Sequence, residues 1–261
     1  MQIGITADAA TLAKIPAEVP LDFIEGWVAE CLMPEATDDA YAPRAREIRA
    51  HRWPMPASNR FFPASLRVSG PAVDLARVDR FAASATRRAA EIGMKIIVFG
   101  SGGARMVPEG FSMVAAFEHY VDLLKRLAPF AQQHGTIIAV EPLWRGETNL
   151  VNTILEGGEA VRRANHPAIK LLVDSYHMAR NGESFDDIAK VAPLICHAHI
   201  SEDRDRAPLG THGEDLRPYL RALRRGGYDG RLTLEPVWTD IAAQAGPCVA
   251  ELRRQLVASG Y

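Results

Sequence analysis

The chain has 261 residues, and its 30 basic and 32 acidic residues give a formal net charge of −2. Hydrophobic residues make up 48% of the chain and charged residues 24%, which excludes an intrinsically disordered protein. The near-neutral balance gives no general attraction to nucleic acid or to an anionic membrane, so neither is expected as a partner.

Targeting and redox features favour a cytoplasmic protein. No uninterrupted hydrophobic run approaches the roughly 20 residues that a membrane-spanning helix needs. The first residues, MQIGITADAATLAKIP, lack the basic segment and long apolar core of a secretory signal peptide. Three cysteines, at Cys31, Cys196 and Cys248, are an odd and sparse set that argues against a disulfide scaffold. A reduced, cytoplasmic location is therefore expected.

Short hydrophobic runs predict seven β-strands, and several are apolar at nearly every position, as in parallel strands covered on both faces. These runs are residues 2–6, 21–25, 94–99, 136–140, 170–173, 194–200 and 231–234. An eighth, irregular strand followed by a long loop is expected within residues 51–71, a segment rich in proline and aromatic residues.

Helical patterns separate the strands, because apolar residues recur there at spacings of three and four. In chain order they cover residues 9–15, 44–50, 75–92, 117–131, 216–223 and 249–256. Alternating strands and helices predict a parallel sheet, and eight such units fit a single-domain (β/α)₈ TIM barrel over residues 1–261. An open doubly wound sheet is the alternative, but the first strand is followed by TADAAT instead of a glycine-rich turn.

Four predicted strands in the second half of the chain end in side chains that can bind a metal. Glu141, Asp174 and Glu235 directly follow their strands, and His199 lies one residue before its strand ends. The carboxyl ends of barrel strands surround one cavity, so these side chains are expected to converge. Each could instead be an isolated polar residue at a strand end. Three crowded carboxylates and one imidazole predict one divalent ion, with Mn²⁺ or Mg²⁺ favoured and Co²⁺ or Zn²⁺ possible.

Polar residues near these strand ends are candidates for contact with a substrate. Glu147 lies in the loop EPLWRGETN, and His177 lies three residues after Asp174 in DSYHM. His197 points to the same side of its strand as His199, where it either orients that ligand or is an ordinary core histidine.

The polar segment SEDRDRAPLGTHG, residues 201–213, is long enough to fold over a barrel mouth. Arg204 or Arg206 could contact a substrate oxygen from it, and a solvated charge run is the alternative. The glycine cluster GSGG at residues 100–103 is interpreted as a tight turn in preference to a phosphate cradle.

Four segments resemble the sugar isomerase/epimerase superfamily, whose members have xylose isomerase-like barrels. They are EPLWRGETN (141–149), VDSYHM (173–178), HAHISE (197–202) and GYDGRLTLEP (227–236). The sequence is most similar to the ketose 3-epimerase branch, which includes D-tagatose and D-psicose 3-epimerases, and the motifs match in order and spacing over roughly residues 94–240.

The resemblance implies roles for individual residues. It implies a divalent metal, commonly Mn²⁺, bound by Glu141, Asp174, His199 and Glu235. Glu141 and Glu235 would also act as the acid/base pair. The residues matching Glu147 and His177 hold the substrate.

The chain departs from the family at the substrate-binding arginine. That arginine lies six residues after the metal histidine in the family, where this chain has Asp205 between Arg204 and Arg206. A small register shift would let either arginine serve. If neither does, the substrate differs from a simple ketohexose.

These residues predict a metal-dependent sugar isomerase or epimerase that transfers a proton through an enediolate of a ketose or related polyol. Proton return to the same carbon gives epimerisation, and return to the neighbouring carbon gives aldose–ketose isomerisation.

A keto-inositol-type dehydratase on the same metal site is an alternative. An AP-endonuclease-like zinc hydrolase is less favoured, because few of the eight histidines lie at strand ends. A binding module without chemistry is disfavoured by the intact ligand set. A small-molecule sugar or polyol is the expected partner, and the resemblance implies a homodimer or homotetramer.

Overall fold

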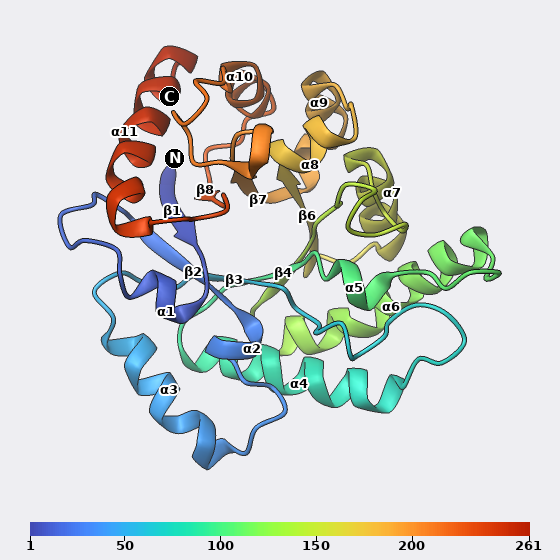
Figure 1. Cartoon of the computed structure of the whole chain (residues 1–261). Helices are drawn as coiled ribbons and strands as arrows, with labels where there is room; N and C mark the ends of the chain where they lie inside the picture. Colours follow the sequence, from blue (N-terminus) through green and yellow to red (C-terminus); the bar gives the residue numbers. More distant parts are fainter.

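A computed structural model describes all 261 residues and contains a closed barrel of eight strands in chain order. Every neighbouring pair is parallel, and β1 closes the barrel against β8. Figure 1 shows the strands at the centre and the helices around them. The strands are β1 (Gln2–Thr6), β2 (Phe23–Trp27), β3 (Ala57–Asn59), β4 (Ile96–Phe99), β5 (Ile137–Val140), β6 (Ile169–Asp174), β7 (Ile195–Ile200) and β8 (Arg231–Leu234). The predicted (β/α)₈ barrel is confirmed.

Helices and short 3₁₀ turns connect the strands. The α-helices are α1 (Ala9–Leu12), α2 (Val28–Cys31), α3 (Asp38–Ala50), α4 (Leu75–Glu91), α5 (Gly102–Arg105), α6 (Met113–Gln133), α7 (Ile154–Ala164), α8 (Ser175–Arg180), α9 (Ile188–Val191), α10 (Arg217–Arg225) and α11 (Ile241–Ser259). The 3₁₀ turns are η1 (Phe185–Asp187), η2 (Ala192–Leu194) and η3 (Arg204–Arg206). None of these helices combines the length and hydrophobicity that crossing a bilayer requires.

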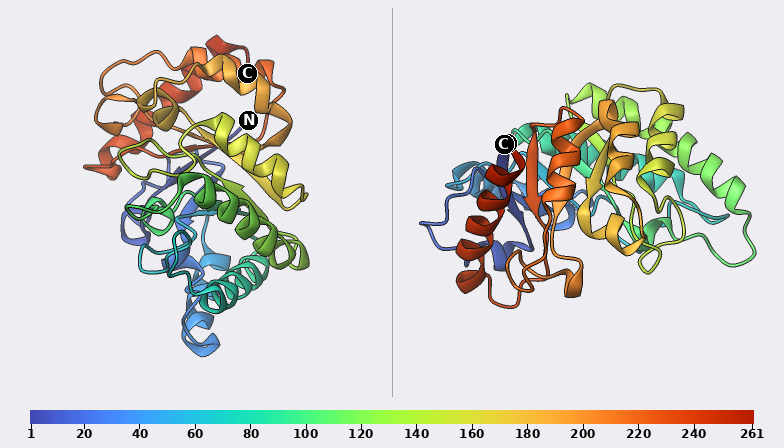
Figure 2. Two further views of the ribbon diagram at one scale, coloured as in Figure 1. Left: turned by 90° about the vertical axis from the view of Figure 1, so that its right-hand side faces the viewer. Right: turned by 90° about the horizontal axis from the view of Figure 1, so that it is seen from above.

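Both chain ends lie at the same side of the barrel, as the ribbons in Figures 1 and 2 show. The amino group of Met1 lies 2.6 Å from the Asp229 carboxylate. The hydroxyl of Tyr261 donates to the carbonyl of Tyr228 at 2.7 Å. The turn that precedes β8 therefore anchors both termini.

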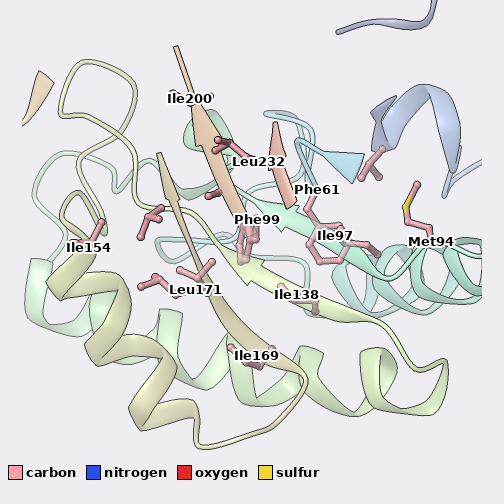
Figure 3. Close-up of a cluster of buried hydrophobic side chains, with 14 of the residues drawn as sticks. Phe61, Met94, Ile97, Phe99, Ile138, Ile154, Ile169, Leu171, Ile200 and Leu232 are labelled. Carbon is pink, nitrogen blue, oxygen red and sulfur yellow. The ribbon is translucent and has the colours of Figure 1, made fainter. Parts of the chain in front are cut away.

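The hydrophobic core has two parts. A cluster of 67 buried residues fills the space between the strands and the surrounding helices. Figure 3 shows part of it, with Phe99, Ile138, Leu171 and Ile200 from four successive strands. A second cluster of five buried residues fills the barrel interior: Ala57, Ile96, Val98, Ala139 and Leu172.

Strand alternation places polar side chains above the inner cluster. Ala139 and Leu172 belong to that cluster, and successive residues of a strand point to opposite faces. Glu141 and Asp174 lie two residues further along the same two strands, so they point into the carboxyl end of the barrel. This parity explains why the predicted metal ligands share one cavity.

Two strands differ most from the predicted ranges, and four others differ by one or two residues at one or both ends. The strand expected over 21–25 runs instead over Phe23–Trp27, because Leu21 N donates to Val19 O in a turn before the sheet. The irregular eighth strand exists but has only three residues, and Pro54 and Pro56, which cannot donate backbone hydrogen bonds, precede it.

Helix α7 was not predicted, because Gly157 and Gly158 interrupt its apolar pattern. It begins with a capping box, in which Glu156 N donates to Thr153 Oγ1 at 3.1 Å and Thr153 N donates to the Glu156 carboxylate at 3.2 Å. A Cβ at Gly157 would come within 2.7 Å of Pro142, and one at Gly158 within 2.6 Å of Val191. Gly157 therefore allows the helix to pack closely against the end of β5, and Gly158 allows it to pack closely against helix α9.

Candidate metal centre and active site

The four predicted metal ligands meet at the carboxyl end of β5–β8. Their ligand atoms all lie within 4.8 Å of one another: Glu141, Asp174, His199 and Glu235. Backbone register brings two of them together directly, because Asp174 of β6 is paired with His199 of β7. Glu141, Asp174 and His199 are buried, and the Glu235 side chain is 16% exposed, so the cluster opens toward solvent on one side.

The His199 ring is oriented by carboxylates on both of its nitrogens. Its Nδ1 lies 2.8 Å from Glu235 Oε2 and 3.2 Å from Glu141 Oε1. Its Nε2 lies 3.2 Å from Glu25 Oε1 on the opposite side. Nδ1 is therefore the nitrogen that faces the carboxylate cluster.

The electrostatics of the cluster show that it needs added positive charge. Burial, together with the charges of Glu235 and Asp174, raises the pKa of Glu141 to about 7, against the opposing effect of His199. Burial likewise raises the pKa of Asp174 to about 6, against the opposing effect of Arg206. Burial disfavours the ionised form of Glu235 as well, but Arg206 and His199 outweigh it and lower its pKa. Burial disfavours the His199 imidazolium, but Glu25 and Glu235 raise its pKa well above the usual value.

The donor set fits a divalent cation. Glu141 Oε1 is buried and accepts no hydrogen bond, which leaves a ligand atom available. Three carboxylates and one imidazole match the preferences of Mn²⁺ or Mg²⁺ and are compatible with Zn²⁺ or Co²⁺.

Removal of the cation should make stability depend on pH. The pKa values of Glu141, Asp174 and His199 are all raised in the folded state, so stability that comes from their protonated forms is lost as pH rises. Glu25 and Glu235 have lowered pKa values and lose their contribution only at acidic pH. We expect chelator-treated protein to lose more than about 1 kcal/mol of unfolding free energy between pH 5 and pH 8.

Urea unfolding at several pH values would measure this loss. Added Mn²⁺ should restore the stability at pH 8, because the cation compensates the ionised carboxylates. The Asp174→Asn variant should show a shallower pH dependence without metal. Metal-free protein that is equally stable at pH 5 and pH 8 would contradict the prediction.

Glu25 and His197 form a buried network beneath His199 that the sequence interpretation recognised only in part. His197 Nε2 lies 2.9 Å from Glu25 Oε2, and Thr233 Oγ1 donates to the same oxygen at 2.9 Å. Burial disfavours the Glu25 carboxylate, but His199 and His197 outweigh it and lower its pKa to about 2. His197 therefore packs as a core histidine and also holds the carboxylate that contacts His199. Glu25 is the last residue of the predicted strand 21–25, and this position at a strand end was the signal that was overlooked.

Of the two candidate arginines, only Arg206 reaches the cluster. Its Nη2 donates to Glu235 Oε2 at 2.6 Å and to Asp174 Oδ2 at 3.1 Å. The Arg204 side chain is 71% exposed and lies beside Asp205, so the structure does not support its predicted contact with substrate. The reason is backbone geometry, since Asp205 and Arg206 both adopt left-handed φ angles, of 59° and 48°. This turn directs Arg206 toward the cluster and leaves Arg204 exposed.

Two glutamates hold the loop that carries Arg206 by accepting hydrogen bonds from its backbone. The buried Glu202 carboxylate accepts from Gly210 N at 2.8 Å and from His212 N at 2.7 Å. Glu214 accepts from the backbone N–H groups of residues 203 and 204. These hydrogen bonds hold the segment after β7 in the conformation that places Arg206 in the cavity wall.

Glu147 and His177 line the same cavity as Glu141, Glu235 and Arg206. Glu147 Oε1 accepts from Trp144 Nε1 at 3.0 Å and lies 3.6 Å from Arg206 Nη1. The backbone N–H of Trp144 donates to His177 Nδ1 at 3.3 Å. Burial and the nearby Arg206 lower the pKa of His177 well below its usual value, so the ring is neutral. Its proton therefore lies on Nε2, 3.5 Å from Asp174 Oδ2.

The cavity has a volume of about 420 Å³ and is lined by residues that follow seven of the eight strands. The turn after β4 contributes Gly100, where a Cβ would overlap the Glu141 carboxylate. Glycine at this position therefore makes room for Glu141. Asn59 also lines the cavity, and its Nδ2 donates to Glu235 Oε1. Neither residue was predicted, because only the folded barrel places them beside the glutamates.

The fold and the strand-end cluster define a barrel protein with a candidate metal centre, and comparison with known families agrees. The chain matches the family described as a xylose isomerase-like TIM barrel over residues 17–254. The chain therefore belongs to that family.

Individual relatives place the chain near sugar epimerases. It is 31% identical to the ketose 3-epimerase of Arthrobacter globiformis over 119 residues, which are 45% of this chain and 41% of that protein. Across the first relatives, the chain spans somewhat less than half of their length. A solved L-ribulose 3-epimerase has a TM-score of 0.81 at 21% identity, covering 99% of this chain and 95% of that one. The solved IOLI protein with a binding zinc atom has a TM-score of 0.76 at 18% identity, covering 99% and 98%. These two structures show similarity of fold.

Proposed function

We propose that this protein is a divalent-metal-dependent sugar epimerase or isomerase that acts on a ketose or related polyol. The observation that carries the proposal is the cluster of Glu141, Asp174, His199 and Glu235, of which Glu141 and Glu235 line an open cavity. Matches to ketose 3-epimerases support the sugar substrate. We propose Mn²⁺ as the metal, because the donor set is rich in oxygen.

The proposed chemistry begins with removal of a proton from a carbon next to a ketone. A divalent ion held by the four ligands would stabilise the negative charge that develops on the substrate oxygens. Glu141 and Glu235 come from β5 and β8, so they approach the cavity floor from different parts of the barrel. One glutamate takes the proton and the other returns a proton. Because the reaction is reversible, each glutamate acts as base in one direction.

Other residues would hold and orient the sugar. Arg206 donates to Glu235 and Asp174 and so fixes the carboxylates beside the reacting carbons. Glu147 and the Nε2–H of His177 line the same cavity and can hydrogen-bond substrate hydroxyls. Assembly into dimers or tetramers remains a prediction.

Solvent deuterium uptake would test the proposal. Protein stripped with chelator and reloaded with Mn²⁺ would be incubated with a panel of ketoses in D₂O. We expect metal-dependent incorporation of deuterium at a carbon next to the carbonyl, with an epimer or an aldose as product. The unloaded protein is the control. A dicarbonyl product formed by loss of water would instead identify a dehydratase. Absence of exchange with every ketose, together with metal-dependent cleavage of abasic DNA, would overturn the proposal in favour of a nuclease.

A further inference from the structure

One cationic side chain in the cavity has no part in the chemistry described above. Arg60 follows β3 and lines the same cavity as Glu141 and Glu235. Its side chain is exposed, whereas Glu141 is buried on the cavity floor. Arg60 therefore lies at the mouth, one residue beyond Asn59, whose amide contacts Glu235.

The charge of Arg60 is unpaired. Arg206, the other arginine of the cavity, contacts Glu235 and Asp174 and lies 3.6 Å from Glu147. Among the charged side chains that line the cavity, Arg60 alone makes no ion pair, and its guanidinium donates no hydrogen bond. All five of its N–H donors are therefore available to a ligand.

The guanidinium is nevertheless held in place. Its Cζ lies 3.7 Å from the centre of the Trp27 ring, and Trp27 also lines the cavity. Stacking on an aromatic face occupies the flat side of the guanidinium and leaves its N–H edge free. This arrangement pre-orients the donors and reduces the entropy lost when they bind a ligand.

The surrounding backbone is held in an unusual shape. Arg60 has a left-handed φ of 60°, and Ser101 on the neighbouring loop has a φ of 48°. Such conformations are strained for non-glycine residues and persist where the surrounding structure enforces them. The two loops are joined because Phe62 N donates to Ser101 Oγ at 2.9 Å. The fold thus maintains the position of Arg60 at the mouth despite its strain.

The pairing of charges in the cavity points to the ligand. Glu147, Asp174 and Glu235 all lie within ion-pair distance of Arg206, whereas Arg60 pairs with no carboxylate. A free guanidinium at the mouth is suited to an oxyanion, which it can bind through two parallel hydrogen bonds. We propose that Arg60 binds an anionic group, a carboxylate or a phosphate, at the end of the sugar remote from the reacting carbons. This inference rests on the proposed function and narrows its substrate to acidic sugars.

Matched substrates would test the inference. Deuterium uptake would be measured with a neutral ketohexose, its 6-phosphate and the ketouronate that carries a terminal carboxylate. We expect kcat/KM for at least one anionic sugar to exceed that for the neutral sugar by tenfold or more. The preferred anion distinguishes carboxylate from phosphate recognition.

Variants would assign this preference to Arg60. Arg60→Gln should raise KM for the preferred anionic sugar at least tenfold with little change in kcat, and should affect the neutral sugar at least fivefold less. Arg60→Lys should recover part of the loss. Arg225→Gln, which removes an exposed arginine outside the cavity, is the matched control. Equal turnover of neutral and anionic sugars, or equal losses with both in Arg60→Gln, would overturn the inference.

A binding measurement separates this inference from the proposed function. Calorimetry with gluconate, which has no ketone to react, should show binding that is weakened tenfold in Arg60→Gln, and sorbitol should bind more weakly than gluconate to the parent protein. Deuterium exchange that fails with every ketose while this pattern holds refutes the epimerase proposal alone. Binding of gluconate and of sorbitol 6-phosphate that is in both cases insensitive to Arg60→Gln refutes the anion site alone.

Discussion

The Glu235→Gln variant is expected to lose at least about a thousandfold in turnover while remaining folded, because general acid/base catalysis contributes on this scale. Glutamine has the size of glutamate but cannot take up a proton near neutral pH. Its carbonyl oxygen can still accept a hydrogen bond from Arg206 or Asn59, the partners of the Glu235 carboxylate. The substitution therefore removes the proposed base with little change in packing.

The assay must separate lost proton transfer from lost metal. Glu235 is also a proposed ligand, so turnover would be measured in excess Mn²⁺ and the bound metal counted by mass spectrometry. Glu118→Gln is a suitable control, because Glu118 pairs with Arg163 on the surface and is outside the cavity. A metal-loaded Glu235→Gln variant with a near-normal rate would rule out the proposed acid/base pair.

Arg105→Met is expected to destabilise the fold by about 3 kcal/mol or more, because each buried acceptor left unpaired costs about 1–3 kcal/mol. Arg105 is fully buried beside the backbone of Glu141. It donates to the carbonyls of Glu141 at 2.8 Å, Phe99 at 3.2 Å and Val151 at 3.1 Å. Methionine can fill part of the space but satisfies none of these carbonyls.

Thermal unfolding would measure this effect. For a chain of this size, 3 kcal/mol corresponds to a decrease in Tm of about 6–12 °C. Arg126→Met is the control, because Arg126 forms an exposed ion pair with Asp79 and such pairs contribute little. Arg105→Lys should fall between the two, since one ammonium group cannot reproduce the planar fork. An Arg105→Met variant with the parent Tm would show that these carbonyls find other partners.

A comparison of the strands with helix α7 explains which predictions from the sequence succeeded. The strands β1 and β8 were predicted at their observed bounds, since a buried parallel strand is a run of apolar residues visible in the sequence. Helix α7 was missed because it contains Gly157 and Gly158, which disfavour a helix in the local sequence. Gly157 packs against Pro142 and Gly158 against Val191, and both partners lie outside the helix. Local pattern cannot reveal a residue chosen for a tertiary contact.

The residues of the candidate site also fall into two groups, those that the sequence identified and those that only the fold decided. Glu141, Asp174, His199 and Glu235 were identified as a possible cluster from the sequence, because each stands at the end of a predicted strand and barrel topology brings strand ends together. The sequence alone did not decide between Arg204 and Arg206. That choice depends on two left-handed residues, which turn Arg206 toward Glu235 and leave Arg204 in solvent.

The amino-acid sequence by itself therefore determined the barrel, the order of its strands, and the four donors at its carboxyl end. These follow from hydrophobic periodicity and strand parity, which are local properties of the chain. Only the tertiary structure decided that Glu25 contacts His199, that Gly100 makes room for Glu141, and that Arg60 lies unpaired over Trp27. Those contacts join residues from different strands and loops, so they arise only when the closed barrel brings these segments together.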